Sequence, residues 1–558
     1  MKKLIISLIY VALAVSCFTS CENKDETTDP QEIIGTGQVV DYTVSDDGTK
    51  VTVEFENGQR STITFDDPLL GEQGVGIQSI TFDEATGMLT FTLTDGTVSK
   101  FPIVPAAPSV VLKNHSATPH LLKRHSGFED LEIYSILSSE DALEQSPDYF
   151  YGSMADGAGL LRNDDGTFTL INNIEAHYSV ARISFDETFK PVKGEIILNA
   201  EATASTAQCS GTLITPEEHG FGPLYLSGGE WGGSARYVYA TDPFRDASEA
   251  GTARTLTSMG QWTIENAVPL NKNAFPNKTI VMIGDDSHGD AGGQLVMYVS
   301  ETVGDLENGK LYALKVGDGT VTDNDLVAEG AGEFDATFVE LDERTYDALN
   351  EEAISKNIMA FNRVEDIDYR RGSAAANREI YFTATGRTAY NDTRTKYGRV
   401  YKLVLDENDP LKAKISVVLN GDDLAGKAKR LHSPDNILAT SNFLYIQEDP
   451  NGYADAPEKE HDAYLYQYNL NTGLLKVVLE SDHRGSTGID NGYASAADRW
   501  GKWELTGMID VSDELGIDGT FILIQQAHSW KDESFKNPTG HGSAIEGSIL
   551  TVVKGLER

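Results

Sequence analysis

The sequence predicts an all-β fold in which a β-propeller body follows a small N-terminal β stalk domain. Past residue 110 the chain alternates short strands, such as 310–316, 399–405 and 464–469, with turns rich in Gly, Asp and Asn, a pattern typical of sandwiches and propellers. Helical periodicity is rare, and residues 343–356 are the main helix candidate. At 558 residues the chain is too long for one compact core, so two or more domains are expected, although a propeller can form a single larger domain.

The N-terminus is interpreted as a lipoprotein signal peptide, residues 1–20. Lys2 and Lys3 precede an apolar run over 4–15, which is too short to span a membrane. Cys21 follows Thr19-Ser20 and is the expected lipidation site, with Cys17 as the alternative; ordinary secretion with cleavage nearby is a further reading. An acyl anchor would hold the protein on a membrane. The expected location is the cell envelope, as an outer-membrane lipoprotein on the periplasmic or the outer face, and the acidic run after Cys21 favours the outer face.

Two copies of a hairpin pattern predict the stalk domain, residues 36–105, after a polar tether at 21–35. Residues 39–65 and 77–103 each alternate apolar and polar positions around two Gly-containing turns, and Gly58 and Gly96 occupy equivalent places. Asn-Gly and Asp-Gly favour tight hairpins because both residues tolerate positive φ. A Pro-Ala linker over 102–108 then leads into the propeller domain, residues 110–558.

The charge balance excludes nucleic acid as a partner. The net charge is −41, and removal of Lys2 and Lys3 with the signal makes it −43. Such a surface repels nucleic acid and attracts divalent cations. Cys209 is then the one cysteine of the folded body, and it is either a buried small hydrophobe or a metal ligand.

Short acidic motifs recur along the body beside predicted strands. Loops at one end of a propeller channel meet even when they are far apart in the chain, so these motifs predict one cation site. The motifs span 173–175, 209–219, 284–286, 363–365, 433–437 and 447–449.

Each motif also has a simpler interpretation. Cys209 with Glu217 and Glu218 suits a transition metal, but the two glutamates also fit a helix start after Thr215-Pro216. The remaining acids end strands or turns, where they can hold a cation or simply face solvent. They are Asp285, Asp286, Asp435 and Glu448.

Arg363 stands two residues before Glu365. Its guanidinium can clamp two oxygens of a tetrahedral oxyanion while the carboxylate holds a metal; a surface ion pair is the alternative. The sequence lacks a Gly-x-Ser-x-Gly elbow, a P-loop, a dinucleotide glycine fingerprint and His-Glu-x-x-His.

In order, the segments from about residue 156 to about 528 resemble the PhoX-type alkaline phosphatases, exported bacterial β-propeller enzymes. The resemblance rests on Asn-Ile-Glu at 173–175, Cys-Ser-Gly-Thr at 209–212, Pro-Glu-Glu at 216–218, Gly-Asp-Asp at 284–286, Phe-Asn-Arg-Val-Glu at 361–365, Pro-Asp-Asn-Ile at 434–437, Gln-Glu-Asp at 447–449 and Glu-Leu-Thr-Gly at 504–507.

The resemblance implies a pair of iron ions bridged by Cys209, with calcium beside them. Arg363 would hold the phosphate. Glu217, Glu218 and Glu365 would be ligands of the cluster, and Glu175, Asp285, Asp286, Asp435 and Glu448 are further candidates. Two features depart from the family. The loop between cysteine and glutamates is shorter and lacks its lysine, and Ile174 replaces a histidine.

These observations predict metal-dependent hydrolysis of phosphate esters by a monomer that uses iron and calcium on a small phosphorylated substrate. Two alternatives stay open. One is a non-catalytic, calcium-stabilised surface propeller that binds a partner or glycan, which the missing lysine favours. The other is a calcium-dependent propeller hydrolase such as a lactonase. Cys209 and Arg363 favour the phosphatase, because structural calcium requires neither a thiol nor a guanidinium.

Overall fold

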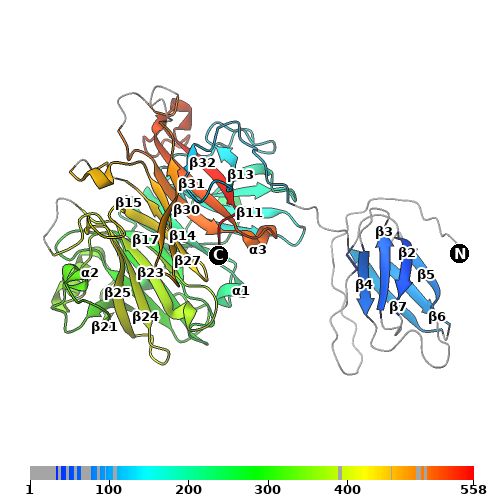
Figure 1. Ribbon diagram of the computed structural model, residues 1–558, viewed down its shortest axis with the longest axis horizontal. Helices are drawn as coiled ribbons and strands as arrows, with labels where there is room; N and C mark the ends of the chain where they lie inside the picture. Colours follow the sequence, from blue (N-terminus) through cyan, green and yellow to red (C-terminus); the bar gives the residue numbers. More distant parts are fainter. Residues whose placement is uncertain are drawn as a thin grey trace. The chain divides into compact units, whose positions relative to one another are not determined.

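The computed structural model divides into two compact units, 1–108 and 109–558 (Figure 1). It describes residues 33–34, 39–45, 50–55, 60–64, 77–83, 88–94, 96–104, 110–387, 393–450, 452–453, 455–484, 492–494 and 499–558. The predicted signal peptide, Cys17, Cys21 and most of the tether lie outside these residues. Within them, no helix is both long enough and apolar enough to cross a membrane.

The first unit consists of two small antiparallel sheets, one for each half of the sequence repeat. One has the order β2-β3-β4, and in the other β1 joins β7-β6-β5 through a parallel pairing. Alternation buries one face of each central strand, as Val51, Val53 and Phe91 show. The bounds are β1 Ile33–Ile34, β2 Val39–Val44, β3 Lys50–Phe55, β4 Arg60–Thr64, β5 Ile77–Asp83, β6 Met88–Leu93 and β7 Val98–Val104.

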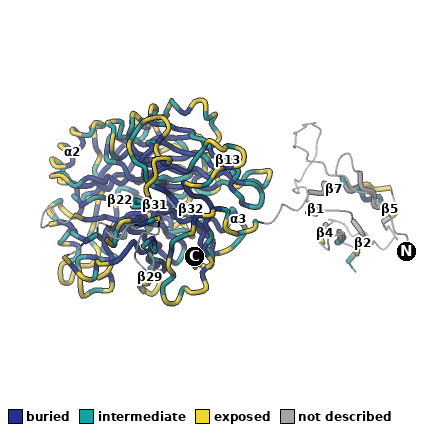
Figure 2. Tube along the Cα trace, turned by 90° about the horizontal axis from the view of Figure 1, so that it is seen from above, coloured by how far each residue is buried: buried dark blue, intermediate teal, exposed yellow. Residues whose placement is uncertain are grey.

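The second unit is a β-propeller, which confirms the predicted fold class. Six strands begin successive antiparallel blades and pack side by side in a ring, and the last, β30, contacts the first, β10, so that the ring closes. Buried backbone fills the inside of this unit, and exposed segments lie at its periphery (Figure 2). The ring strands are β10 Ala155–Arg162, β14 Thr206–Ile214, β17 Ile264–Pro269, β22 Val364–Tyr369, β26 Pro434–Ala439 and β30 Glu504–Asp510.

The outer strands complete the blades. They are β11 Phe168–Ile174, β12 Ser179–Phe185 and β13 Pro191–Leu198 in blade 1; β15 Leu224–Gly232 and β16 Val238–Thr241 in blade 2; β18 Thr279–Asp285, β19 Leu295–Ser300, β20 Lys310–Val316 and β21 Phe334–Leu341 in blade 3; β23 Glu379–Ala384, β24 Arg399–Leu405 and β25 Lys412–Asn420 in blade 4; β27 Phe443–Glu448, β28 Tyr464–Asn469 and β29 Leu475–Ser481 in blade 5; β31 Thr520–Lys531 and β32 Glu546–Lys554 in blade 6.

Two early strands finish the last two blades. β8 (Leu122–Arg124) pairs with β29, and β9 (Glu132–Ser138) pairs with β32, where Tyr134 lies opposite Val552. This pairing joins the beginning of the body to its end and covers an edge strand. β21 and β25 also pair, which merges blades 3 and 4 into one nine-stranded sheet.

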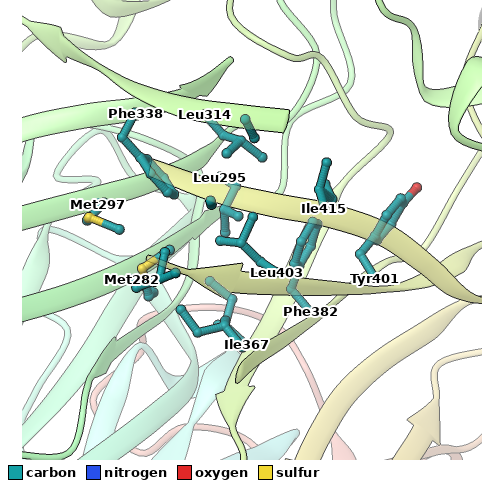
Figure 3. Packing of buried hydrophobic residues seen from close by; sticks show 14 of the residues in the cluster. Met282, Leu295, Met297, Leu314, Phe338, Ile367, Phe382, Tyr401, Leu403 and Ile415 are labelled. Atoms are coloured by element: carbon teal, nitrogen blue, oxygen red, sulfur yellow. The ribbon is translucent and has the colours of Figure 1, made fainter. Parts of the chain in front are cut away.

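Blades 3 and 4 share a continuous apolar core, in which side chains of both blades interdigitate (Figure 3). Phe382 stacks on Tyr401 with ring centroids 4.7 Å apart, and Phe361 meets Phe382 edge-on at 5.4 Å. Stacked and edge-on aromatic pairs fix ring positions more tightly than aliphatic contacts do. Through Val268 and Val364, this core also packs β17 against β22.

Helices are few. α2 (Tyr346–Ser355) lies within the predicted 343–356 and turns Leu349 and Ala353 inward. The others are α1 Pro216–His219 and α3 Ser512–Leu515, with the 3₁₀ turns η1 Glu175–His177, η2 Ala247–Glu249, η3 Thr257–Met259, η4 Asp323–Val327, η5 Ala376–Arg378, η6 Pro457–Lys459 and η7 Glu533–Phe535.

Candidate metal centre

The ring strands place acidic or thiol side chains near the starts of the strands, at one end of the ring. In four blades the acid is the second residue of the ring strand, in blade 6 it is the first, and in blade 2 a cysteine stands at the fourth position. These residues are Asp156, Glu265, Glu365, Asp435, Glu504 and Cys209. All of them are buried.

A β-bulge occurs at this position in five of the ring strands, and in β30 it begins two residues after Glu504. The pairing register shifts between Ile264 and Ala267 in β17, and likewise across residues 155–158, 208–211, 364–367, 434–437 and 506–509. A bulge lets consecutive residues escape strict alternation and re-aims their side chains. The side chains of the acid and of the residue after it can therefore both point into the ring interior.

Several ring strands are also entered through left-handed backbone. Met154, Ser205, Arg363 and Ser433 immediately precede β10, β14, β22 and β26, with φ of 58°, 56°, 66° and 46°. Non-glycine residues rarely adopt this region, and such strain concentrates at functional sites because surrounding contacts must maintain it. The contacts of the surrounding fold therefore maintain this strained backbone at the end of the ring where the acids lie.

Cys209 joins the carboxylates into one centre. Its sulfur lies within 4.8 Å of oxygens of Asp156 and Glu175 in one group, and of Glu230 and Glu265 in a second. Its thiol donates a hydrogen bond to Glu230. A third group shares Glu265 with Glu365 and Asp435 under the same limit. We call this linked set the central cage; its members are Asp156, Glu175, Cys209, Glu230, Glu265, Glu365 and Asp435.

The central cage is electrostatically unfavourable without cations. Burial raises the pKa of Glu230, Glu265 and Asp435 well above the usual range, and neighbouring carboxylates raise it further. The same causes bring the pKa of Asp156 to about 8. Burial, followed by the charges of nearby glutamates, raises the pKa of the Cys209 thiol. Bound divalent ions would remove both penalties.

Among the described residues, Arg363 is the cation that forms an ion pair with the cage. Its Nε donates to Asp286 Oδ1 at 2.7 Å and its Nη2 to Asp286 Oδ2 at 3.1 Å, while Nη2 lies 3.0 Å from Glu365 Oε1. Burial lowers the pKa of Arg363, but Asp286 and Glu365 raise it more, so the guanidinium stays charged. Its side chain is 22% exposed, which leaves it reachable from the ring mouth.

A second layer of polar side chains holds the cage residues in place. Ser210 Oγ donates to Glu265 Oε1 at 2.7 Å and receives Asn436 Nδ2 at 2.5 Å. Asn266 Nδ2 donates to Asp366 Oδ1 at 2.6 Å. Trp231 Nε1 and Gln526 Nε2 both donate to Glu175. These bonds cross between blades and orient potential ligands.

Glu217 and Glu218, which the resemblance suggested as ligands, lie elsewhere. They begin α1, where Thr215 caps the helix by accepting from the Glu218 amide. Glu217 is exposed, and Glu218 pairs with Arg371 and Tyr369. Acids stabilise a helix N-terminus, so the helix-start interpretation describes this pair.

The other three predicted ligands differ in their roles among the described residues. Asp286 borders the cage, because it holds Arg363 and forms a side-chain hydrogen bond with Glu230. Asp285 accepts from Thr263 and Ser287, and burial raises its pKa to about 7. Glu448 belongs to a different buried group with His432 and His461, and its carboxylate accepts two backbone N–H groups.

Sequence reasoning missed Asp156, Glu230, Glu265 and Glu504. The sequence does contain a signal for part of this set. One residue after the start of the strand, an acid is followed by Asn or Asp, as in Glu265-Asn266, Glu365-Asp366 and Asp435-Asn436. The predicted residues that the structure does bring together are Cys209, Glu175, Glu365 and Asp435, with Arg363 and Asp286 beside them.

No protein-family model and no curated protein matches this sequence. Among solved structures, PhoX of Pseudomonas fluorescens in complex with vanadate, a transition-state analogue, aligns with a TM-score of 0.52 and 14% identity over 80% of this chain and 97% of that chain. The Neurospora crassa Pan2 WD40 domain aligns with a TM-score of 0.33 and 11% identity over 76% and 96%. The PhoX likeness supports a PhoX-like propeller fold; at this identity it shows the fold alone.

The chemistry of the central cage fits the implied ions. A thiolate with carboxylates suits a transition metal such as iron, and the all-oxygen group of Glu265, Glu365 and Asp435 suits calcium. The buried, mutually repelling acids supply the charge that such ions require.

Proposed function

We propose that the propeller catalyses metal-dependent hydrolysis of phosphate esters. The observation that carries this proposal is the buried thiol of Cys209 inside a carboxylate cage with Arg363 at its mouth. Structural calcium requires neither a thiol nor a guanidinium. The PhoX likeness supports the same direction at the level of fold.

The residues have distinct tasks in this mechanism. Cys209, Glu175, Glu230 and Asp156 would hold iron, and Glu265, Glu365 and Asp435 would hold calcium. When bound, these ions supply Lewis-acid charge to the phosphate. Arg363 donates N–H groups to the phosphate oxygens, where negative charge is concentrated in the transition state.

Asp286 positions the guanidinium through its paired contacts, so Arg363 is oriented before substrate arrives. The small phosphorylated substrate would enter from the ring mouth. We propose the same cell-envelope, lipid-anchored setting that the N-terminal sequence predicts, with a monomeric protein. In that setting substrate reaches the centre from outside the cytoplasm.

A calcium-stabilised binding propeller is the second candidate. The all-oxygen group and the missing lysine of the cysteine loop favour it. It predicts bound calcium without iron and no turnover, and a calcium-dependent lactonase predicts turnover of lactones instead of phosphate esters.

The deciding experiment combines metal analysis with hydrolysis of p-nitrophenyl phosphate by the full chain. The proposal expects iron and calcium in the wild type, with iron and turnover both lost in Cys209→Ala. Glu217→Gln is the matched control, because this acid lies outside the cage, and it should keep both. A wild type that contains calcium alone and does not hydrolyse the ester would refute the proposal, as would full turnover in a folded Cys209→Ala protein.

A further inference from the structure

A second group of potential ligands lies beside the central cage. One oxygen each of Asp449 and Glu504 and one nitrogen of His528 lie within 4.8 Å of one another. Asp449 follows β27, Glu504 begins β30, and His528 lies in β31. We call these three residues the rim group.

Glu504 is the unusual member. Its side chain is 9% exposed, and it makes no hydrogen bond to any described residue; its recorded contact is His528 Nε2 at 3.7 Å. A buried carboxylate normally has several hydrogen bonds or a paired charge. Burial raises the pKa of Glu504 well above the usual range, and Asp449, Asp435 and Asp156 raise it further. Among the described residues, His528 is therefore its one ion-pair contact, and that contact is longer than a hydrogen bond.

His528 is oriented by a carboxylate on its far side. Its Nδ1 lies 2.7 Å from Glu546 Oε2, and Glu546 begins the neighbouring strand β32. The acceptor fixes the proton on Nδ1 and leaves Nε2 facing Glu504. A carboxylate that holds one imidazole nitrogen while the other binds metal is the usual arrangement around histidine ligands.

The donor set selects the class of ion. Calcium takes oxygen ligands, whereas one imidazole with two carboxylates suits zinc and related divalent transition ions. Three protein ligands leave a coordination position open, as in catalytic zinc sites. His528 is 27% exposed, so an ion can reach the group from solvent.

We propose that Asp449, Glu504 and His528 form a second, zinc-type metal site at the rim of the propeller mouth, with Glu546 orienting His528. The site adjoins the central cage but shares no ligand with it. It does not rest on the phosphatase proposal.

The competing explanation is a plain ion network, in which a protonated His528 bridges Glu504 and Glu546. Burial lowers the pKa of His528, but its hydrogen bond to Glu546 and the charge of that carboxylate raise it more. The two explanations differ in whether the rim group takes up a metal ion.

The test measures zinc bound to the metal-stripped full chain by native mass spectrometry. It then uses Cu²⁺ as a probe and detects imidazole coordination by electron spin echo modulation. We expect His528→Ala and Glu504→Gln each to bind one zinc ion fewer than the wild type, and His528→Ala to lose the imidazole signal. Glu546→Gln should lower the affinity for this ion by about 10- to 100-fold.

His125→Ala is the matched control, since His125 also pairs with a glutamate, Glu480, at 3.1 Å but belongs to no ligand group among the described residues. It should keep the full zinc count and the imidazole signal. Unchanged zinc stoichiometry in folded Glu504→Gln and His528→Ala proteins would overturn the proposal and leave the ion network as the explanation.

Discussion

At the residue scale, Arg363 combines three features that seldom occur together. It has positive φ, it is partly exposed, and it is held by two carboxylates. A surface ion pair, the simpler reading of Arg363 and Glu365, would not require strained backbone or a buried partner. Glu365 is 1% exposed, so this pair belongs to the centre.

Replacing Arg363 with lysine should reduce kcat for phosphate ester hydrolysis by about 10²-fold, because lysine keeps the charge and loses the planar fork. Steady-state kinetics with p-nitrophenyl phosphate measures this, and metal analysis checks that the centre stays loaded. Arg162→Lys is the matched control, since Arg162 lies at the end of β10 opposite to Asp156, where it stacks over Phe168. Unchanged kcat in Arg363→Lys would remove Arg363 from the mechanism.

At the element scale, the bulges of the ring strands depend on close backbone contact between neighbouring blades. Gly157 follows Asp156, and a Cβ there would lie 2.2 Å from the backbone nitrogen of Gly211 in β14. Only glycine allows β10 and β14 to approach so closely. This contact places Asp156 beside Cys209.

Gly157→Ala should therefore lower the free energy of unfolding by about 1–3 kcal/mol through overpacking, and should reduce the iron content. Urea unfolding followed by circular dichroism measures the first effect. Gly332→Ala is the matched control, because a Cβ at Gly332 meets nothing within 4 Å. Equal free energies of unfolding for the two variants would show that β10 and β14 can move apart at no cost in stability.

The sequence was sufficient to predict many of the strands, but it was not sufficient to predict the full set of potential metal ligands. Turn residues and alternation predicted strands such as 310–316 and 464–469, which match β20 and β28, because these signals are local. Cys209 and Glu365 were found because their residue types are conspicuous. Glu217 and Glu218 misled because adjacent acids have the same appearance at a helix start and in a metal loop. Glu230 reaches Cys209 through the pairing of β14 with β15, and Glu265 reaches it through the packing of β14 against β17. The local residue pattern does not encode either contact.

At the scale of the whole molecule, the propeller concentrates acids of five blades and a thiol in its interior. Because the ring is closed, its strands cannot move apart to relieve the repulsion between these groups. The folded, metal-free protein must therefore bind protons in place of metal ions. The pKa of Asp156 and Glu448 rises to about 8 and that of Asp366 to about 7, chiefly through burial.

These shifts predict how stability depends on pH. Carboxyl groups in the unfolded chain titrate near pH 4, so between about pH 4 and 8 the folded state holds more protons than the unfolded state. Stability contributed by these groups is then lost as pH rises through the folded pKa values. Metal-stripped protein should melt at a lower temperature at pH 8.5 than at pH 5.5.

Calcium should raise the melting temperature more at pH 8.5 than at pH 5.5, because protons compete with the ion for the same carboxylates. Thermal unfolding of the full chain, with and without calcium, measures both effects. Glu365→Gln should reduce the calcium effect, and Glu217→Gln should leave it intact. A calcium effect of equal size at the two pH values would mean that the buried acids of the ring are not where the ion binds.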